Sequence, residues 1–144
     1  QTVPEIAFPV MTYLGKGDAL IKLGRADEAE RLIREALAEA TQEGSAGYQA
    51  ELTMRLALIA ENRKQIAQAL QLMARATRLA RSTGTQLLVA NLAMEHSRAL
   101  RAAGRAAEAE ATLIEGVTAS RETGERLVLP RLLAQLADLQ LSMN

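Results

Sequence analysis

Three glycines stand 40 residues apart in this chain, at Gly44, Gly84 and Gly124. A second set of breaks recurs halfway between them, at Gly24, Lys64 and Gly104. Helix-forming residues such as Ala, Leu, Glu and Arg fill most of the intervening stretches. A fixed period of this length is typical of stacked repeat proteins, in which each repeat buries its apolar face against its neighbours. Such proteins usually act through shape and surface, not through a catalytic pocket.

The composition agrees with a helical protein built as one domain. The 144 residues are 49% hydrophobic but only 2% aromatic, so the core must be aliphatic. No proline interrupts the chain between Pro9 and Pro130. We therefore predict an all-α fold without strands.

Each period is expected to hold two antiparallel helices. The apolar spacing predicts helix pairs over about 10–44, 50–84 and 90–124, followed by a final helix over about 130–142. The glycines suit helix ends, because glycine readily takes the left-handed conformation of a C-terminal cap. Asp27 and Glu28 suit the start of a helix, and Pro130 suits the first turn of the last one. The prediction is seven helices.

Two of the turns have closely similar sequences, which read Gly24-Arg25-Ala26-Asp27-Glu28-Ala29 and Gly104-Arg105-Ala106-Ala107-Glu108-Ala109. With Tyr13, Gly17, Leu20 and Ile33, they resemble the tetratricopeptide repeat over almost the whole chain. The period of 40 is longer than the usual 34, as in bacterial MalT-like regulators, peptide-sensing Rap-type proteins and kinesin light chain. The resemblance implies a right-handed α-solenoid of three helix pairs plus one final helix, residues 1–144 forming one domain of a larger bacterial protein.

The resemblance also implies where helices approach most closely. Small residues recur at these positions in every repeat: Gly17, Ala57 and Ser97; Ala29, Ala69 and Ala109; and Ala36, Ala76 and Gly116.

The charges narrow the choice of partners. Lys and Arg (17) balance Asp and Glu (17), so the basic surface of a general nucleic-acid binder is not expected. Residues 49–88 hold six basic against two acidic residues, which indicates either an ordinary solvated surface or a shallow basic surface for an acidic partner. No apolar run is long enough to span a bilayer. We expect a cytoplasmic protein, with a secreted or periplasmic mature form as the alternative.

No catalytic or metal-binding set has credible spacing. The chain has no cysteine, and its single histidine, His96, is expected to be a packed, hydrogen-bonded core residue. The motif Gly15-Lys16-Gly17 lacks the spacing of a phosphate-binding loop. The acidic run from Asp27 to Glu30 fits a helix start better than a calcium site. We therefore expect no enzyme activity, metal or cofactor.

The resemblance places partner binding on a concave groove lined by the first helix of each pair. The candidate groove residues are Met54, Arg55, Asn62, Asn91, Met94, Arg98, Arg101 and Arg131. Met11, Met54 and Met94 recur at nearly the same position in the repeat and would form an adaptable apolar strip. The arginines and asparagines would hold a peptide's carboxylate or backbone, the alternative being a solvated face without a ligand.

The expected function is that of a protein-interaction or scaffold module for a protein or peptide. The alternative is an effector-sensing segment of a signalling protein or transcription regulator. Direct binding of nucleic acid or membrane is not expected. The last helix carries a wide apolar stripe that includes Leu132, Leu133, Leu136, Ala137 and Leu139. This stripe predicts contact with a following repeat or with a second copy of the chain.

Overall fold

The 40-residue period of the sequence appears in the structure as a stack of helix pairs. A computed structural model describes the backbone of residues 7–144 and the side chains of residues 13–144. Within residues 7–144 there are seven α-helices and no strand. Their bounds are α1 Ala7–Lys22, α2 Ala26–Glu43, α3 Ala46–Asn62, α4 Ile66–Arg81, α5 Gln86–Ala102, α6 Ala106–Thr123 and α7 Leu129–Met143. The prediction of an all-α, solenoid-like fold is confirmed, while the handedness of the superhelix remains a prediction.

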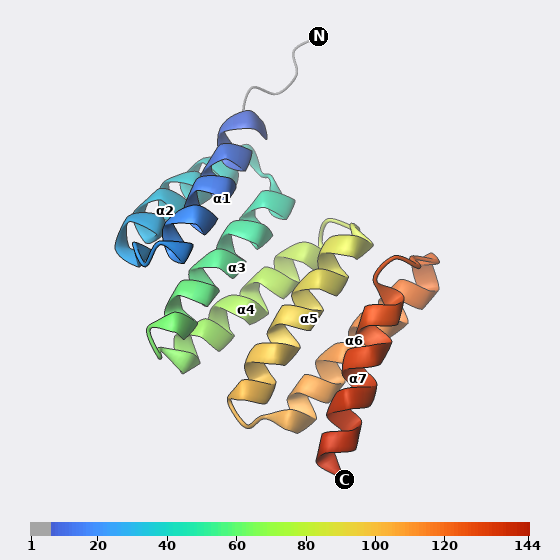
Figure 1. Ribbon diagram of the computed structural model, residues 1–144. Coiled ribbons are helices and arrows are strands. Elements are labelled where there is room, and N and C mark those ends of the chain that lie inside the picture. Colours follow the sequence, from blue (N-terminus) through green and yellow to red (C-terminus); the bar gives the residue numbers. More distant parts are fainter. Residues whose placement is uncertain (1–6) are drawn as a thin grey trace.

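Each helix packs against the next one along the chain, and α1 also contacts α3 as α5 contacts α7. Figure 1 shows this order, with α1 at one end of the stack and α7 at the other. We call α1, α3, α5 and α7 the first helices and α2, α4 and α6 the second helices. The first helices begin a few residues earlier than predicted, since α3 starts at Ala46 and α5 at Gln86.

The turns within the pairs share one backbone geometry. Gly24 and Gly104 have φ values of 77° and 79°, and Lys64 takes the same conformation at 63°. In each turn the amide of the third residue beyond the helix bonds to the carbonyl five residues earlier, as from Gln65 to Ala60 at 2.9 Å. This is the Schellman arrangement, which satisfies carbonyls at the helix end. The predicted breaks at Gly24, Lys64 and Gly104 are therefore all helix ends.

Small residues let the helices of a pair approach closely, as the repeat pattern predicts. Ala29, Ala69 and Ala109 are at most 1% exposed. A Cβ atom added at Gly17 would lie 3.1 Å from the side chain of Ile33. At Gly116 it would lie 3.1 Å from the Cβ atom of Ala93. The core thus consists of alanines at the contacts and larger aliphatic residues such as Leu52, Leu92 and Leu132 between repeats.

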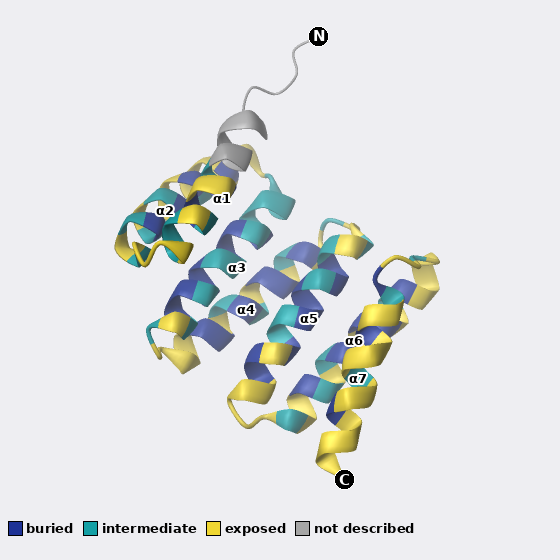
Figure 2. Cartoon of the chain, in the orientation of Figure 1, coloured by how far each residue is buried: buried dark blue, intermediate teal, exposed yellow. Residues whose placement is uncertain are grey.

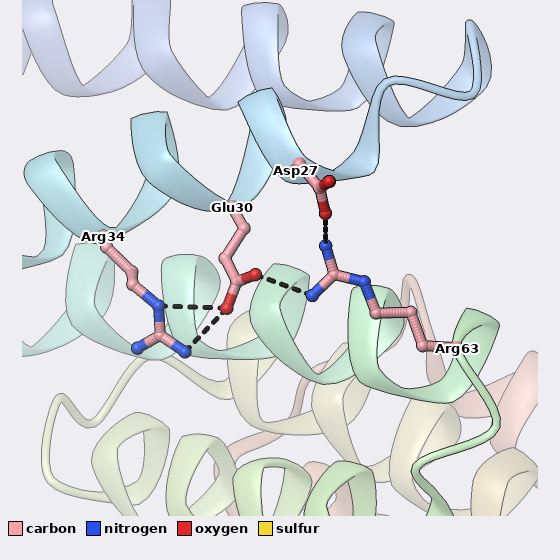
Figure 3. A network of polar contacts seen from close by, with 4 residues as sticks. All are labelled: Asp27, Glu30, Arg34 and Arg63. Carbon is pink, nitrogen blue, oxygen red and sulfur yellow. Dashed lines mark hydrogen bonds and ion pairs between the residues drawn. The ribbon is translucent and has the colours of Figure 1, made fainter.

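Ion pairs add to the apolar contacts between the first two repeats. Figure 3 shows Arg63, the residue after α3, reaching Asp27 and Glu30 of α2, while Arg34 holds the same Glu30 carboxylate. The bond from Arg63 to Glu30 is 2.6 Å long, and that from Arg34 is 2.8 Å. Hydrogen bonds from Arg63 and then Arg34 lower the pKa of Glu30. Glu30 therefore stays charged in neutral solution and ties α2 to α3.

Candidate functional site

A hollow of about 440 Å³ lies between the first helices α3, α5 and α7. We call it the groove hollow. It is lined by Met54, Asn91, Met94, Glu95, Ser97, Arg98, Arg101, Leu113, Arg131, Gln135, Asp138 and Leu139. Six of the eight predicted groove residues are therefore brought together: Met54, Asn91, Met94, Arg98, Arg101 and Arg131.

The other two candidates lie outside this hollow. Arg55 is largely buried, with 16% of its side chain exposed, and its guanidinium holds the Asp18 carboxylate through bonds of 3.0 and 3.1 Å. Asn62 is exposed at the last residue of α3. The predicted methionine strip is formed by Met54 and Met94 in the groove hollow, whereas the side chain of Met11 lies outside the described residues.

The groove hollow is apolar at its base and polar at its rim. Met94 and Leu139 are 5% and 1% exposed, so they form the buried apolar base of the hollow. Asn91 and Gln135 contribute amide groups, which donate and accept hydrogen bonds. Such a combination of apolar base and a few polar groups is typical of binding sites.

Most of the arginines predicted to bind a ligand are engaged by other helices. Arg98 holds Glu61 of α3 through bonds of 2.8 and 3.1 Å. Arg101 bonds Asp138 of α7 at 2.7 Å. The hydrogen bond with Glu61 and the nearby charge of Glu95 raise the pKa of Arg98. These arginines connect successive first helices, a role that the sequence prediction missed.

A regular offset in the sequence was the signal for these pairs. Arg55 with Asp18, Arg98 with Glu61 and Arg101 with Asp138 are each 37 residues apart. The spacing of 37 residues is three less than the 40-residue period. Three residues are about one helical turn, so the two charged groups of each pair face each other on neighbouring first helices. Opposite charges spaced by 37 residues would therefore have predicted all three pairs.

Arg131 is in a different position. It is exposed on the first turns of α7, and no ion pair to it occurs among the side chains of residues 13–144. The start of α7 is fixed by Glu125, whose carboxylate accepts the amides of Leu127 at 2.8 Å and Val128 at 3.0 Å. These two bonds lower the pKa of Glu125. The groove hollow thus contains one guanidinium, that of Arg131, which makes no ion pair within residues 13–144.

A second hollow of about 520 Å³ adjoins the first. It lies beside the amino-terminal parts of α3 and α5 and is lined by Ser45, Gly47, Tyr48, Glu51, Thr83, Thr85, Leu87, Leu88 and Asn91. Asn91 lines both hollows, so the two meet at α5. Leu87 is 45% exposed in the second hollow, which gives this part an accessible apolar surface.

The prediction for His96 is wrong in part. Its side chain is half-buried, and it makes no hydrogen bond to any described residue. It lies in a hollow of about 380 Å³ with residues of α4 and α6, whereas Glu95 lines the groove hollow. Burial, followed by the positive charges of Arg105 and Arg81, lowers the pKa of His96. His96 is only half-buried because its imidazole lies at the rim of the hollow between α4 and α6, where part of the ring contacts solvent.

The basic excess of residues 49–88 is also partly used within the fold. Arg55, Arg63 and Arg81 pair with acidic residues of other repeats. Arg75 and Arg78 remain exposed on α4. The middle repeat therefore presents only part of its basic residues to a partner.

Across the described side chains, no group of three or more His, Cys, Asp or Glu residues is placed to hold a metal ion. None of the helices in the described part of the chain combines the length and apolar character needed to cross a membrane.

Comparison with known proteins gives no assignment. No protein-family model matches this chain, and no curated protein matches it.

Proposed function

We propose that this protein is a non-enzymatic interaction module that binds a peptide or protein segment in the groove along α3, α5 and α7. The observation that carries the proposal is the groove hollow, where three successive first helices contribute an apolar base and converging polar groups. A site built from several repeats suits an extended ligand, because each repeat contacts a different part of it.

The groove chemistry narrows the class of ligand. Met54 and Met94 offer flexible, polarizable side chains, which adapt to apolar side chains of varied shape. Arg131 offers a guanidinium that can bind a carboxylate through two parallel bonds. The ligand that fits best is a peptide with an apolar side chain next to an acidic group, and its backbone would bond to Asn91.

Selection from a random peptide display library on the immobilised 144-residue protein tests this proposal. The affinity of the best peptide is then measured for Arg131→Ala and for Arg75→Ala, a matched loss of an exposed arginine from α4. Loss of a hydrogen bond to a charged group costs about 1.5–3 kcal/mol, so Arg131→Ala should weaken binding about 10- to 100-fold. Arg75→Ala should leave the affinity unchanged. An equal effect of both variants, or no peptide bound in the groove, would contradict the proposal.

The ion pairs favour a second candidate function, that of an effector-sensing segment. Arg101–Asp138 and Arg98–Glu61 connect successive first helices at the edge of the groove hollow. An acidic ligand would compete with Asp138 for Arg101 and so change the packing of α7 on α5. The structure of the stack would then depend on ligand occupancy.

Fluorescence energy transfer distinguishes sensing from simple binding. The chain has no cysteine, so labels can be placed at Ala38→Cys on α2 and Ser142→Cys on α7, both exposed positions. Sensing predicts a change in transfer efficiency when the selected peptide saturates the protein. A transfer efficiency that stays constant at saturation would contradict sensing and would support simple binding by an interaction module.

A further inference from the structure

Equivalent positions of three successive first helices carry an acidic, a neutral and a basic side chain. Glu51 of α3, Asn91 of α5 and Arg131 of α7 follow each other at 40 residues, so they occupy the same place in the repeat. Figure 1 shows these three helices following one another across the molecule. Glu51 lines the second hollow, Arg131 lines the groove hollow, and Asn91 lines both. A ligand that crosses the two hollows therefore meets a negative, a neutral and a positive group in this order.

The negative end is the second hollow. Among the described residues that line it, Glu51 is the only charged one. Arg55 lies 3.9 Å from the Glu51 carboxylate, but its guanidinium makes closer bonds of 3.0 and 3.1 Å to Asp18. No other ion pair to the Glu51 carboxylate occurs within residues 13–144. The charge of Glu51 is therefore only weakly compensated within the described chain.

Tyr48 adds an aromatic ring to the same end. It precedes Glu51 by three residues on α3, which places the two side chains on one face of the helix. The face of an aromatic ring attracts a cation, and a carboxylate beside it accepts the cation's hydrogen bonds. Leu87 and Leu88 supply apolar surface for the aliphatic part of a lysine or arginine side chain. The lining of the second hollow therefore fits a basic side chain.

A glycine leaves room for that side chain. Gly47 lines the second hollow, whereas the equivalent positions 40 and 80 residues later are Leu87 and Leu127. A Cβ atom at Gly47 would lie 4.0 Å from the side chains of Leu88 and Thr83, which line the same hollow. Figure 2 shows the start of α3 as partly buried, so solvent reaches these side chains. The missing side chain at Gly47 thus contributes to the space of the second hollow.

The positive end is the groove hollow. Arg131 is exposed and makes no ion pair within residues 13–144. The other charged residues that line this hollow are paired, namely Arg98 with Glu61 and Glu95, and Arg101 with Asp138. The uncompensated charge of the groove hollow is therefore that of Arg131, and its sign is opposite to that of Glu51.

We propose that the two hollows bind a dipolar peptide segment, with a basic side chain against Tyr48 and Glu51 and an acidic side chain against Arg131. The segment is the ligand of the proposed function, on which this inference rests. Packed helices lie about 10 Å apart, so α3 and α7 are about 20 Å apart across α5. An extended chain rises about 3.3 Å per residue, so about six positions separate the basic from the acidic residue. The backbone between them passes Asn91.

Double-mutant cycles between protein and peptide test the two contacts separately. The peptide is the best one selected on the immobilised protein, with either its basic or its acidic residue changed to Gln. Each change should weaken binding to the parent protein about tenfold. With Glu51→Gln, loss of the basic residue should cost no more than about twofold, whereas loss of the acidic residue should still cost about tenfold. Arg131→Ala should give the reverse pattern.

The matched control is Glu39→Gln, which neutralises an exposed carboxylate of α2 that makes no ion pair within residues 13–144. It should change neither the affinity nor the effect of the two peptide changes. A groove-binding peptide without a basic residue, or one whose basic residue is not coupled to Glu51, would overturn the dipolar ligand and leave the interaction module intact. Failure to select any groove-binding peptide would overturn both.

Filling the second hollow gives an independent test. Gly47→Leu restores the leucine of the other repeats, and its Cβ atom would make only ordinary contacts. Since glycine is unfavourable within a helix, the melting temperature should not fall. The selected peptide should bind at least about tenfold more weakly, whereas Gly47→Ala, which adds the Cβ atom alone, should stay within about twofold of the parent. Unchanged binding to a folded Gly47→Leu variant would show that the ligand does not use the second hollow and would overturn the proposal.

Discussion

Lys64 adopts a left-handed backbone conformation with φ of 63°, at the point where the first and third repeats have Gly24 and Gly104. His96 is a second departure, because its counterparts in the period are Leu56 and Leu136. At both positions the fold keeps its local geometry although one residue differs from its equivalents. Each departure therefore predicts a gain in stability when the residue of the other repeats is restored.

Lys64→Gly should raise the melting temperature. The left-handed conformation costs a residue with a side chain roughly 1–2 kcal/mol, while glycine loses about 0.4–1 kcal/mol through the extra freedom of the unfolded chain. The net gain of up to about 1.5 kcal/mol corresponds to a rise of up to about 6 °C for a domain of this size. The reverse change, Gly104→Lys, serves as the control and should lower it. If Lys64→Gly melts below the parent, the strain at this turn is absent.

His96→Leu should stabilise the fold and make it less dependent on pH. The pKa of His96 is lowered from 6.5 in the folded chain, so the unfolded chain binds the proton more tightly. Stability therefore falls as the pH drops from above 6.5 through the lowered folded pKa, and the leucine variant escapes this loss. Thermal melts at pH 7 and 5.5 should show a difference between variant and parent that grows at the lower pH. A histidine NMR titration midpoint above 6.5 would contradict the account.

At the scale of helices, contacts within pairs and contacts between repeats use different residues. Pairs pack through small buried residues such as Ala29, Ala69 and Ala109. Repeats are joined in addition by exposed ion pairs, for example Arg98 with Glu61. The first kind of contact tolerates no added volume, whereas exposed ion pairs contribute little to stability.

Ala109→Leu should therefore destabilise the fold more than Arg98→Ala. Ala109 is 0% exposed against α5, and extra methylene groups in such a contact cost about 1–3 kcal/mol. Arg98 is 46% exposed, so loss of its ion pair should cost less than about 1 kcal/mol. Urea unfolding of both variants measures the two values. A larger loss for Arg98→Ala would mean that the ion pairs, not the alanine contacts, dominate the stack.

At the scale of the whole molecule, the 40-residue period of the sequence accounts for most of the features that could be predicted. Because glycine marks helix ends and apolar residues recur at helical spacing, the number and order of helices followed from the sequence. The position of six groove residues followed as well, because equivalent residues of stacked repeats lie on one face. Helix starts were less predictable, since α3 and α5 begin without a side-chain cap at the residue before the helix.

The pairing of charges could not be predicted from single positions. Whether Arg98 or Arg101 faces a ligand or a neighbouring helix depends on the offset between two repeats, which a residue-by-residue pattern does not contain. The pairing of Arg55 with Asp18 of α1, outside the groove hollow, was not predicted for the same reason. Half-burial of His96 depends on the spacing of α4 and α6, which no local signal gives.

The central claim is that the groove along α3, α5 and α7 is the binding surface. Amide chemical-shift mapping with the strongest library peptide tests it most directly. The account predicts shifts concentrated at the groove, at Asn91, Met94, Arg131 and their neighbours, with α2 and α4 unchanged. Shifts concentrated instead on the exposed arginines of α4 would contradict it and would assign binding to the second helices.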